Sequence, residues 1–208
     1  IGVHYSSPVQ CGQHSPYKAI EQGERHVLAI TDDGTMWSWG DNSSEGSIGD
    51  GTVVDKSFPV QIGVGITWVT ASSGFVTAAA IDDDGKLYTW GDNNDGKLGD
   101  GTTTDRSAVT QLGSLTDWAK ITVGQRGMTA VKTDGTLWQW GEGGEGLIGD
   151  GSTTTRSSPV QIGSLTTWSE PRNGNKHAGA LKTDGTIWVW GDNGNGQLGI
   201  DSTTDTSS

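Results

Sequence analysis

Residues 132–141 read Lys-Thr-Asp-Gly-Thr-Leu-Trp-Gln-Trp-Gly, which is the clearest structural signal in the chain. An Asp-Gly pair between two apolar runs is a strong local signal for a β-hairpin, because both central residues of its tight turn need positive φ. The stretch therefore predicts strands over residues 128–132 and 136–140, joined at Asp134-Gly135.

The stretch ends on an aromatic-x-Trp-Gly unit that occurs four times. The tryptophan of the unit stands at Trp39, Trp90, Trp140 and Trp190, which gives spacings of 51, 50 and 50 residues. An Asp-Gly pair precedes every unit at the same distance, and a polar loop rich in Gly, Thr and Asp follows it. Self-similarity at a fixed period of this size is typical of solenoids and propellers.

Each copy is predicted to contain four strands. In the third copy they cover residues 119–123, 128–132, 136–140 and 159–162, and no segment of the chain keeps a helical period over ten residues. Four short strands per repeat indicate an all-β protein, a β-propeller with four visible blades of four antiparallel strands. We treat residues 1–208 as a single propeller or part of one, with repeats at about 6–56, 57–106, 107–156 and 157–208.

The two ends of the chain complement each other in this frame. Residues 6–10 supply a fourth strand with no strands before it, and the sequence stops where the next Pro-Val-Gln strand is due. The ends could close one blade together, or each could join further blades or neighbouring chains. Because the chain starts with Ile rather than Met, we expect it to be processed or to be a piece of a longer polypeptide.

Composition argues against several classes of partner and chemistry. The net charge is −12, which disfavours nucleic acid and anionic membranes, and no apolar run is long enough to span a bilayer. The four histidines lack metal-ligand spacing, and the oxygen-rich stretch at residues 92–96 fails the calcium-loop pattern. We predict no catalytic residues, no metal and no cofactor, and therefore no enzyme.

Two residue types have structural interpretations. The tryptophans of the Trp-Gly units recur at one strand position, so Trp39, Trp90, Trp140 and Trp190 are predicted to be buried blade core. The single cysteine, Cys11, replaces Ile or Leu of the other copies and is predicted to be an apolar filler.

The repeated pattern resembles the regulator of chromosome condensation repeat. The resemblance rests on Lys-Thr-Asp-Gly-Thr-Leu-Trp-x-Trp-Gly, then Gly-x-Leu/Ile-Gly-Asp-Gly-Thr, then Ser-Pro-Val-Gln-Ile-Gly, and it covers the whole chain. It implies a ring of about seven blades, of which four copies are a part. The near-identical, Thr-Asp-rich copies resemble bacterial and phage versions of the repeat. Neither the insertion nor the basic face of the exchange-factor members is present, and Glu24 stands where the photoreceptor members have Trp.

The four copies differ most in the turn after the first strand. We predict that these turns lie on one rim and form the partner-binding surface, as the matching turns do in members that inhibit β-lactamases. Drift at exposed positions is the alternative explanation, and His26 and His177 also fit a structural role. The predicted partner-binding residues are Glu24, Arg25, His26, Phe75, Val76, Gln125, Arg126, Asn175, Lys176 and His177. Arg25, Phe75, Arg126 and Lys176 are the predicted anchors.

The sequence thus predicts a non-enzymatic protein-binding or structural module. We expect it in a larger virion or cell-surface assembly, where it recognises a protein or a surface glycan. The alternative is a regulator of a small GTPase or of another enzyme, of exchange-factor or inhibitor type, that also acts by protein binding.

Overall fold

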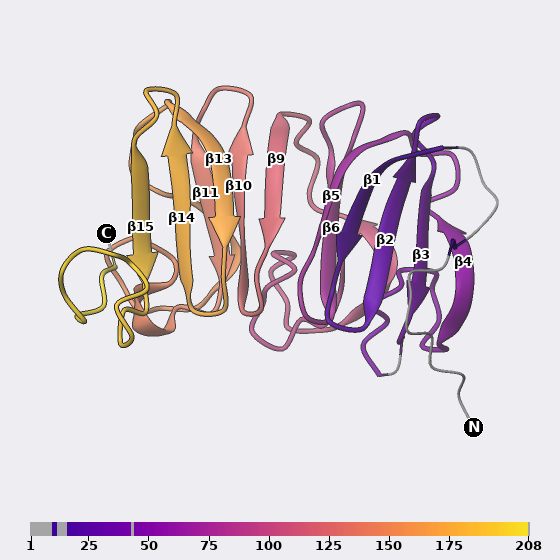
Figure 1. Ribbon diagram of the computed structural model, residues 1–208, viewed down its shortest axis with the longest axis horizontal. Helices are drawn as coiled ribbons and strands as arrows, with labels where there is room; N and C mark the ends of the chain where they lie inside the picture. The colour runs from indigo at the N-terminus through magenta and orange to yellow at the C-terminus, as the bar shows by residue number, and fades with distance from the viewer. Residues whose placement is uncertain (1–9, 12–15, 43, 208) are drawn as a thin grey trace.

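The computed structural model describes residues 10–11, 16–42 and 44–207, whose strands form four antiparallel sheets (Figure 1). The first two sheets contain β1 (Tyr17–Gln22), β2 (His26–Thr31), β3 (Met36–Gly40) and β4 (Lys56–Ile62), then β5 (Trp68–Ser73), β6 (Thr77–Asp82), β7 (Leu87–Gly91) and β8 (Arg106–Gln111). The other two contain β9 (Trp118–Val123), β10 (Gly127–Lys132), β11 (Leu137–Gly141) and β12 (Arg156–Gln161), then β13 (Trp168–Asn173), β14 (His177–Lys182) and β15 (Ile187–Gly191). Among these residues, the single helix is the short 3-10 helix η1 (Gly144–Gly146).

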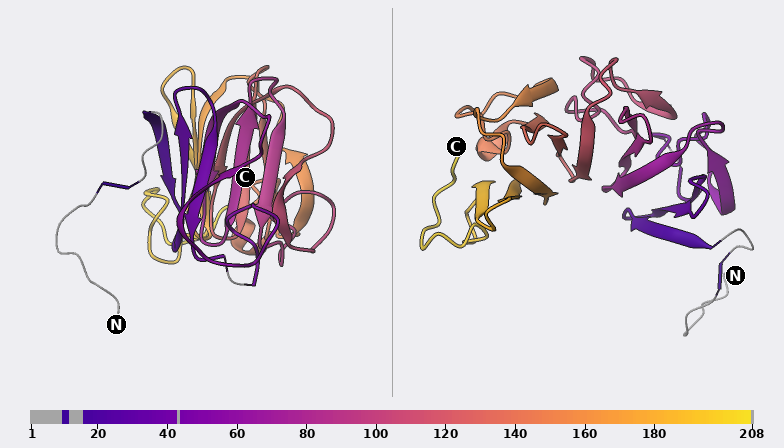
Figure 2. Two further views of the ribbon diagram at one scale, coloured as in Figure 1. Left: turned by 90° about the vertical axis from the view of Figure 1, so that its right-hand side faces the viewer. Right: turned by 90° about the horizontal axis from the view of Figure 1, so that it is seen from above.

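The sheets are the blades of a propeller. Seen from above in Figure 2, they stand side by side along an open arc, with the β1–β4 sheet at one end and the β13–β15 sheet at the other. The first strands of neighbouring blades contact one another along the inside of this arc. The predicted all-β propeller with four visible blades is confirmed, but the last sheet has three strands rather than the predicted four. The total of about seven blades stays a prediction.

The hairpin turns differ from the predicted type. Gly135 has a φ of 79°, but Asp134 does not share its positive φ, so this is not a turn with two left-handed residues. Instead Gly135 N donates to Lys132 O at 2.9 Å, and Lys132 N donates to Thr136 O at 3.0 Å. The Asp134 carboxylate accepts from the backbone and hydroxyl of Thr136. The aspartate thus holds a longer turn, in which only glycine needs the left-handed conformation.

Neighbouring blades meet through three contacts that recur at every junction. The first is a side-chain bond: Trp140 Nε1 donates to Lys97 O of the preceding blade at 2.9 Å. The second is Gly51 N to Ser107 O at 2.8 Å, and the third is Trp68 N to Gly34 O at 2.8 Å. At the other junctions the equivalents are Trp90 to Ser47, Trp190 to Leu147, Gly101 to Ser157, Gly151 to Ser207, Trp118 to Gly85 and Trp168 to Gly135.

The predicted burial of the Trp-Gly tryptophans is confirmed for three of the four. Trp90, Trp140 and Trp190 are buried, whereas Trp39 is only half-buried. Trp39 belongs to the first blade, so no preceding blade among the described residues covers it. The prediction of a buried Trp39 is therefore wrong for the chain as it stands.

The described part of the N-terminal region corrects a second expectation. Cys11 is exposed, so its predicted role as a buried apolar filler is wrong. The predicted strand at residues 6–10 lies outside the described residues except for Gln10. At the other end, Thr206 forms an isolated bridge with Gly191, at the position where β4, β8 and β12 begin in their blades. No helix in the described part of the chain is long and apolar enough to cross a membrane.

Candidate partner-binding rim

Four short turns, each between the first and second strand of a blade, lie at the lower edge of the molecule in Figure 1. We call this surface the inner-turn rim and define it as residues 23–26, 74–77, 124–127 and 174–177. Strand direction places these turns together, because the first strand runs toward this edge in every blade and the second runs away from it. The predicted location of the four turns on one rim matches this arrangement.

A row of glycines joins the turns. A Cβ added to Gly23 would lie 2.7 Å from Gly74 O, and one added to Gly74 would lie 2.6 Å from Gly124 O. The row continues to Gly174, whose carbonyl oxygen accepts a hydrogen bond from Gln125 N at 3.2 Å. These close approaches require glycine, so the side chains of the rim come from the variable residues that follow it.

Most of the predicted contact residues are accessible on this rim. Phe75 is 42% exposed and is the aromatic side chain that the four turns present to solvent. The other exposed residues are Glu24, Arg25, Gln125 and Asn175, and the half-buried ones are Val76, Arg126, Lys176 and His177.

His26 is the exception, and its prediction as a partner contact is corrected. Its side chain is 2% exposed, and its Nε2 lies 2.7 Å from Ser73 Oγ of the next blade. Burial lowers the pKa of His26 to about 4, against a smaller opposing effect of Asp41. The ring is therefore neutral and holds two blades together, which supports the structural interpretation of this histidine.

Acidic side chains of the long loops reach the same rim. Three ion pairs connect rim and loops: Arg25 with Asp41 at 3.5 Å, Arg126 with Glu142, and Lys176 with Glu145 at 2.9 Å. Sequence reasoning missed these acids because they stand 16 or 31 residues from the bases they pair with. One signal was available: the residue after each Trp-Gly is Asp or Glu in all four copies.

These pairs change the character of the predicted anchors. Arg25, Arg126 and Lys176 present cations that nearby carboxylates already neutralise in part, whereas Phe75 presents apolar surface. The long loops and the inner-turn rim form one continuous surface rather than two separate ones. Phe75 is consequently the strongest candidate anchor on it.

The inside of the arc holds a cavity and an ion pair. A cavity of about 610 Å³ is lined by the first strands, with the Lys120–Glu170 ion pair on its wall. A hydrogen bond from Lys120 lowers the pKa of Glu170, so this carboxylate is a stable anion rather than a proton donor. Among the described residues, no group of three or more His, Cys, Asp or Glu side chains could hold a metal ion.

Comparison with known proteins identifies the repeat. Two family models of the regulator of chromosome condensation (RCC1) repeat match residues 84–131 and residues 17–45, 68–97 and 174–197. Together these matches cover more than half of the chain. The ultraviolet-B receptor UVR8 of Arabidopsis thaliana is 38% identical over 76 residues, which are 36% of this chain and 17% of the receptor.

Solved structures agree with this assignment. Human WBSCR16 superposes with a TM-score of 0.85 at 25% identity over 94% of this chain and 52% of its own. Prp20p of Saccharomyces cerevisiae, described with its binding to Gsp1p and histones, superposes with a TM-score of 0.76 at 21% identity over 92% and 48%. The chain thus spans about half the length of these two propellers.

Proposed function

Because this chain belongs to the regulator of chromosome condensation (RCC1) repeat family, we propose that it is a non-enzymatic module that binds a partner protein through the inner-turn rim. The observation that carries the proposal is the exposure of Phe75 on a rim whose glycine framework repeats while its side chains vary. Binding surfaces are commonly displayed by variable loops on a rigid scaffold.

The energetics of interfaces support the choice of Phe75 as the central contact. An aromatic side chain buries a large apolar area at low entropic cost, and a few such residues dominate most interfaces. The surrounding ion pairs would form the polar edge of the contact, where they add orientation more than affinity. The acidic loops favour a partner whose matching face is basic or neutral.

The partner class admits one alternative. A small GTPase is the runner-up, because the X-linked retinitis pigmentosa GTPase regulator of Mus musculus is 39% identical to this chain over 75 residues. An exchange assay, in which the 208-residue chain is added to a GTPase loaded with fluorescent nucleotide, distinguishes the two. Accelerated nucleotide release would favour the regulator, and binding without release would favour the plain recognition module. A place in a virion or cell-surface assembly rests on the sequence resemblance alone and stays a prediction.

The proposal is tested by comparing two exposed apolar residues on opposite rims. Phe75 lies on the inner-turn rim, and Leu165 lies in the connection from β12 to β13 at the other edge with a similar exposure of 45%. Proteins captured by the immobilised chain from an extract of its source cells are identified and purified, and the affinity of each for three versions of the chain is measured.

We expect Phe75→Ala to raise the dissociation constant by roughly 5- to 30-fold, which corresponds to about 1–2 kcal/mol. Leu165→Ala should leave it unchanged. Equal binding by the Phe75→Ala variant, or a loss seen only with Leu165→Ala, would place the partner elsewhere and refute the proposal.

A further inference from the structure

The inner turn of the second blade differs in charge from the other three. At the second residue after the turn glycine, the other blades have a base: Arg25, Arg126 and Lys176. Each of these bases forms an ion pair with a carboxylate of the long loops. The second blade has Val76 at this position, directly after Phe75. It therefore presents an apolar pair where the other turns present a charge.

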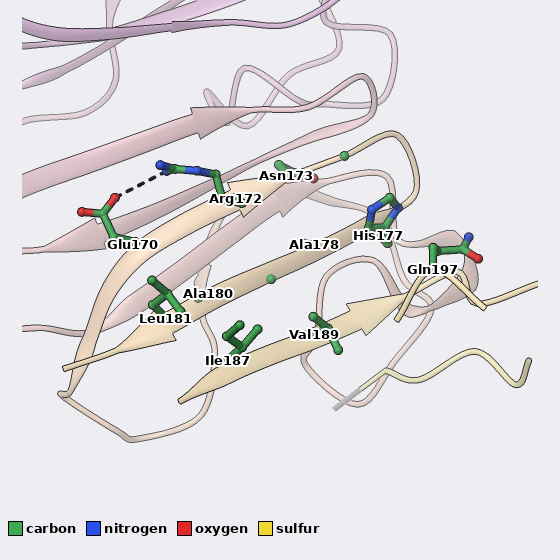
Figure 3. A pocket seen from close by; sticks show the side chains of 12 residues that line it. Glu170, Arg172, Asn173, His177, Ala178, Ala180, Leu181, Ile187, Val189 and Gln197 are labelled. Atoms are coloured by element: carbon green, nitrogen blue, oxygen red, sulfur yellow. Dashed lines mark hydrogen bonds and ion pairs between the residues drawn. The ribbon is translucent and has the colours of Figure 1, made fainter. Parts of the chain in front are cut away.

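A cation that the other blades lack lies below this turn. Lys97 forms an ion pair with Asp92, the acid that follows the Trp-Gly unit, and both side chains are buried. The same ammonium donates to Gln125 O of the next blade at 3.4 Å. At the position of Lys97 the other copies have uncharged residues, Ser47, Leu147 and Gln197. In the last blade, Gln197 lines a cavity together with His177 of the rim (Figure 3).

The two differences in the second blade compensate for each other. Asp41 and Glu142 follow the Trp-Gly units of their blades and pair with a base from the turn. Asp92 has no such base above it, because Val76 carries no charge, and it pairs with Lys97 instead. Loss of the turn base alone would leave a buried carboxylate unpaired, which is strongly destabilising. The exchange keeps the ion pair and removes the charge from the surface, which favours selection for an apolar contact over drift.

Carboxylates flank the apolar pair on the side of the first blade. The row of turn glycines places the turn of the second blade between those of the first and third blades. In the first turn, Arg25 lies 3.8 Å from Glu24 and 3.5 Å from Asp41. Two acids thus share one base, and this side of the apolar pair keeps an excess of negative charge.

The side of the third blade has the same excess. A hydrogen bond from Arg126 to Glu142 raises the pKa of the guanidinium. The nearby carboxylates of Asp95 and Glu145 raise it further, and Glu145 also pairs with Lys176. Three acids therefore face two bases here, and Asp95 is in no ion pair with another residue of the described chain. The Phe75–Val76 pair thus lies between two groups of charges that are both acidic in sum.

We infer that the partner docks a basic segment on this surface, with an apolar side chain against Phe75 and Val76 and with Lys or Arg side chains toward the carboxylates on either side. The inference rests on the proposed function and specifies its partner. Charges at the edge of an interface select the partner and its orientation more than they add affinity. An uncharged segment fills the apolar contact but leaves the excess carboxylates without partners, and an acidic segment is repelled by them.

The test selects ligands without knowledge of the natural partner. Short random peptides displayed on phage are enriched on the immobilised 208-residue chain, and in parallel on its Phe75→Ala variant. Peptides enriched on the native chain alone should combine an apolar residue with Lys or Arg on both sides and should lack Asp and Glu. The most enriched of these peptides is synthesised with a fluorescent label and serves as the probe. Its binding should weaken at high salt, and a version with Gln in place of Lys and Arg should bind more weakly with little dependence on salt.

Variants of the chain then separate the apolar contact from the charges beside it. Val76→Arg restores the base of the other turns, and Asp95→Lys reverses the charge of an acid beside the apolar pair. Each should raise the dissociation constant of the probe by about tenfold or more, because each sets a cation against a basic segment. Asp83→Lys reverses an exposed acid between β6 and β7 on the opposite rim and should leave the constant unchanged.

A double variant guards against misfolding. Val76→Arg together with Lys97→Ser gives the second blade the residue types of the first, Arg25 and Ser47, so it should fold as the first blade does. Circular dichroism should show the native fold, and the probe should bind this variant as weakly as it binds Val76→Arg alone.

The outcomes distinguish the inference from the proposed function. Peptides that depend on Phe75 but carry no basic residues would overturn the inference and leave the proposed function standing. Enrichment of acidic peptides, the absence of any enriched peptide, or native affinity in both Val76→Arg and Asp95→Lys would also overturn the inference. Enriched peptides that bind the Phe75→Ala variant as tightly as the native chain would overturn both.

Discussion

At the scale of single residues, Trp140 links two blades by packing and by one hydrogen bond. Its ring is fully buried, and its Nε1 donates to Lys97 O at 2.9 Å. We expect Trp140→Ala to lower the free energy of unfolding by about 3–5 kcal/mol, because it leaves a large cavity between blades. Trp140→Phe keeps most of the packing and should cost about 1–2 kcal/mol. Urea unfolding of the two variants would contradict this account if their losses were equal.

His26 gives the chain a defined pH dependence. Its pKa is about 4 in the folded chain and 6.5 when unperturbed, so between these values the unfolded chain binds a proton that the folded chain does not. The contribution of neutral His26 to the free energy of unfolding is therefore fully present above about pH 6.5. It is lost as the pH falls toward 4, by about 3 kcal/mol in total. His26→Gln removes the titrating group.

The measurement is the free energy of unfolding by urea at about pH 7 and at about pH 4.5. The lower pH lies above the ordinary pKa values of Asp and Glu, so that most carboxylates keep their charge. The native chain should lose stability between the two, and the His26→Gln variant should lose much less. An identical loss in both proteins would show that His26 is not responsible.

At the scale of elements, a buried asparagine holds together the long loop that follows the Trp-Gly unit. In the second blade this residue is Asn93. Asn93 Nδ2 donates to Thr102 O and Thr104 O at 3.1 and 3.0 Å, and its Oδ1 accepts from Leu98 N at 2.9 Å. Asn93→Ala leaves these buried backbone groups without partners and should cost about 3 kcal/mol. The neighbouring Asn94 is exposed, so Asn94→Ala should change stability by less than about 0.5 kcal/mol. Comparable losses in thermal unfolding would contradict the assigned role of Asn93.

Local signals in the sequence were sufficient for the strands and blades. The Asp-Gly pairs and Trp-Gly units predicted the hairpins from a few residues each. The Asp-Gly pair indicates the turn, and the Trp-Gly unit indicates a buried position in the strand that follows it. They did not give the turn type at Asp134, since its side chain competes for the hydrogen bonds of the turn. They also could not give the burial of His26 or the exposure of Trp39, because the presence or absence of a neighbouring blade determines both.

At the scale of the whole molecule, the repeat makes each blade dependent on its neighbours. The same three junction contacts recur between successive blades, so a blade at the end of the arc leaves one face uncovered. The candidate site has the same origin: the rim exists because four turns pack through the glycines at Gly23, Gly74, Gly124 and Gly174. The sequence predicted that the turns lie on one rim. It did not predict that the acidic loops lie beside them, because the ion pairs join segments that are distant in the sequence.

The most direct test of partner binding at the inner-turn rim is a photo-cross-linking experiment. A photoreactive phenylalanine analogue is introduced at position 75, or at position 165 on the opposite rim, and each chain is irradiated in an extract of its source cells. We predict a covalent adduct with one discrete protein from position 75 and none from position 165. An adduct from position 165 alone, equal adducts from both positions, or none from either would contradict binding at the inner-turn rim.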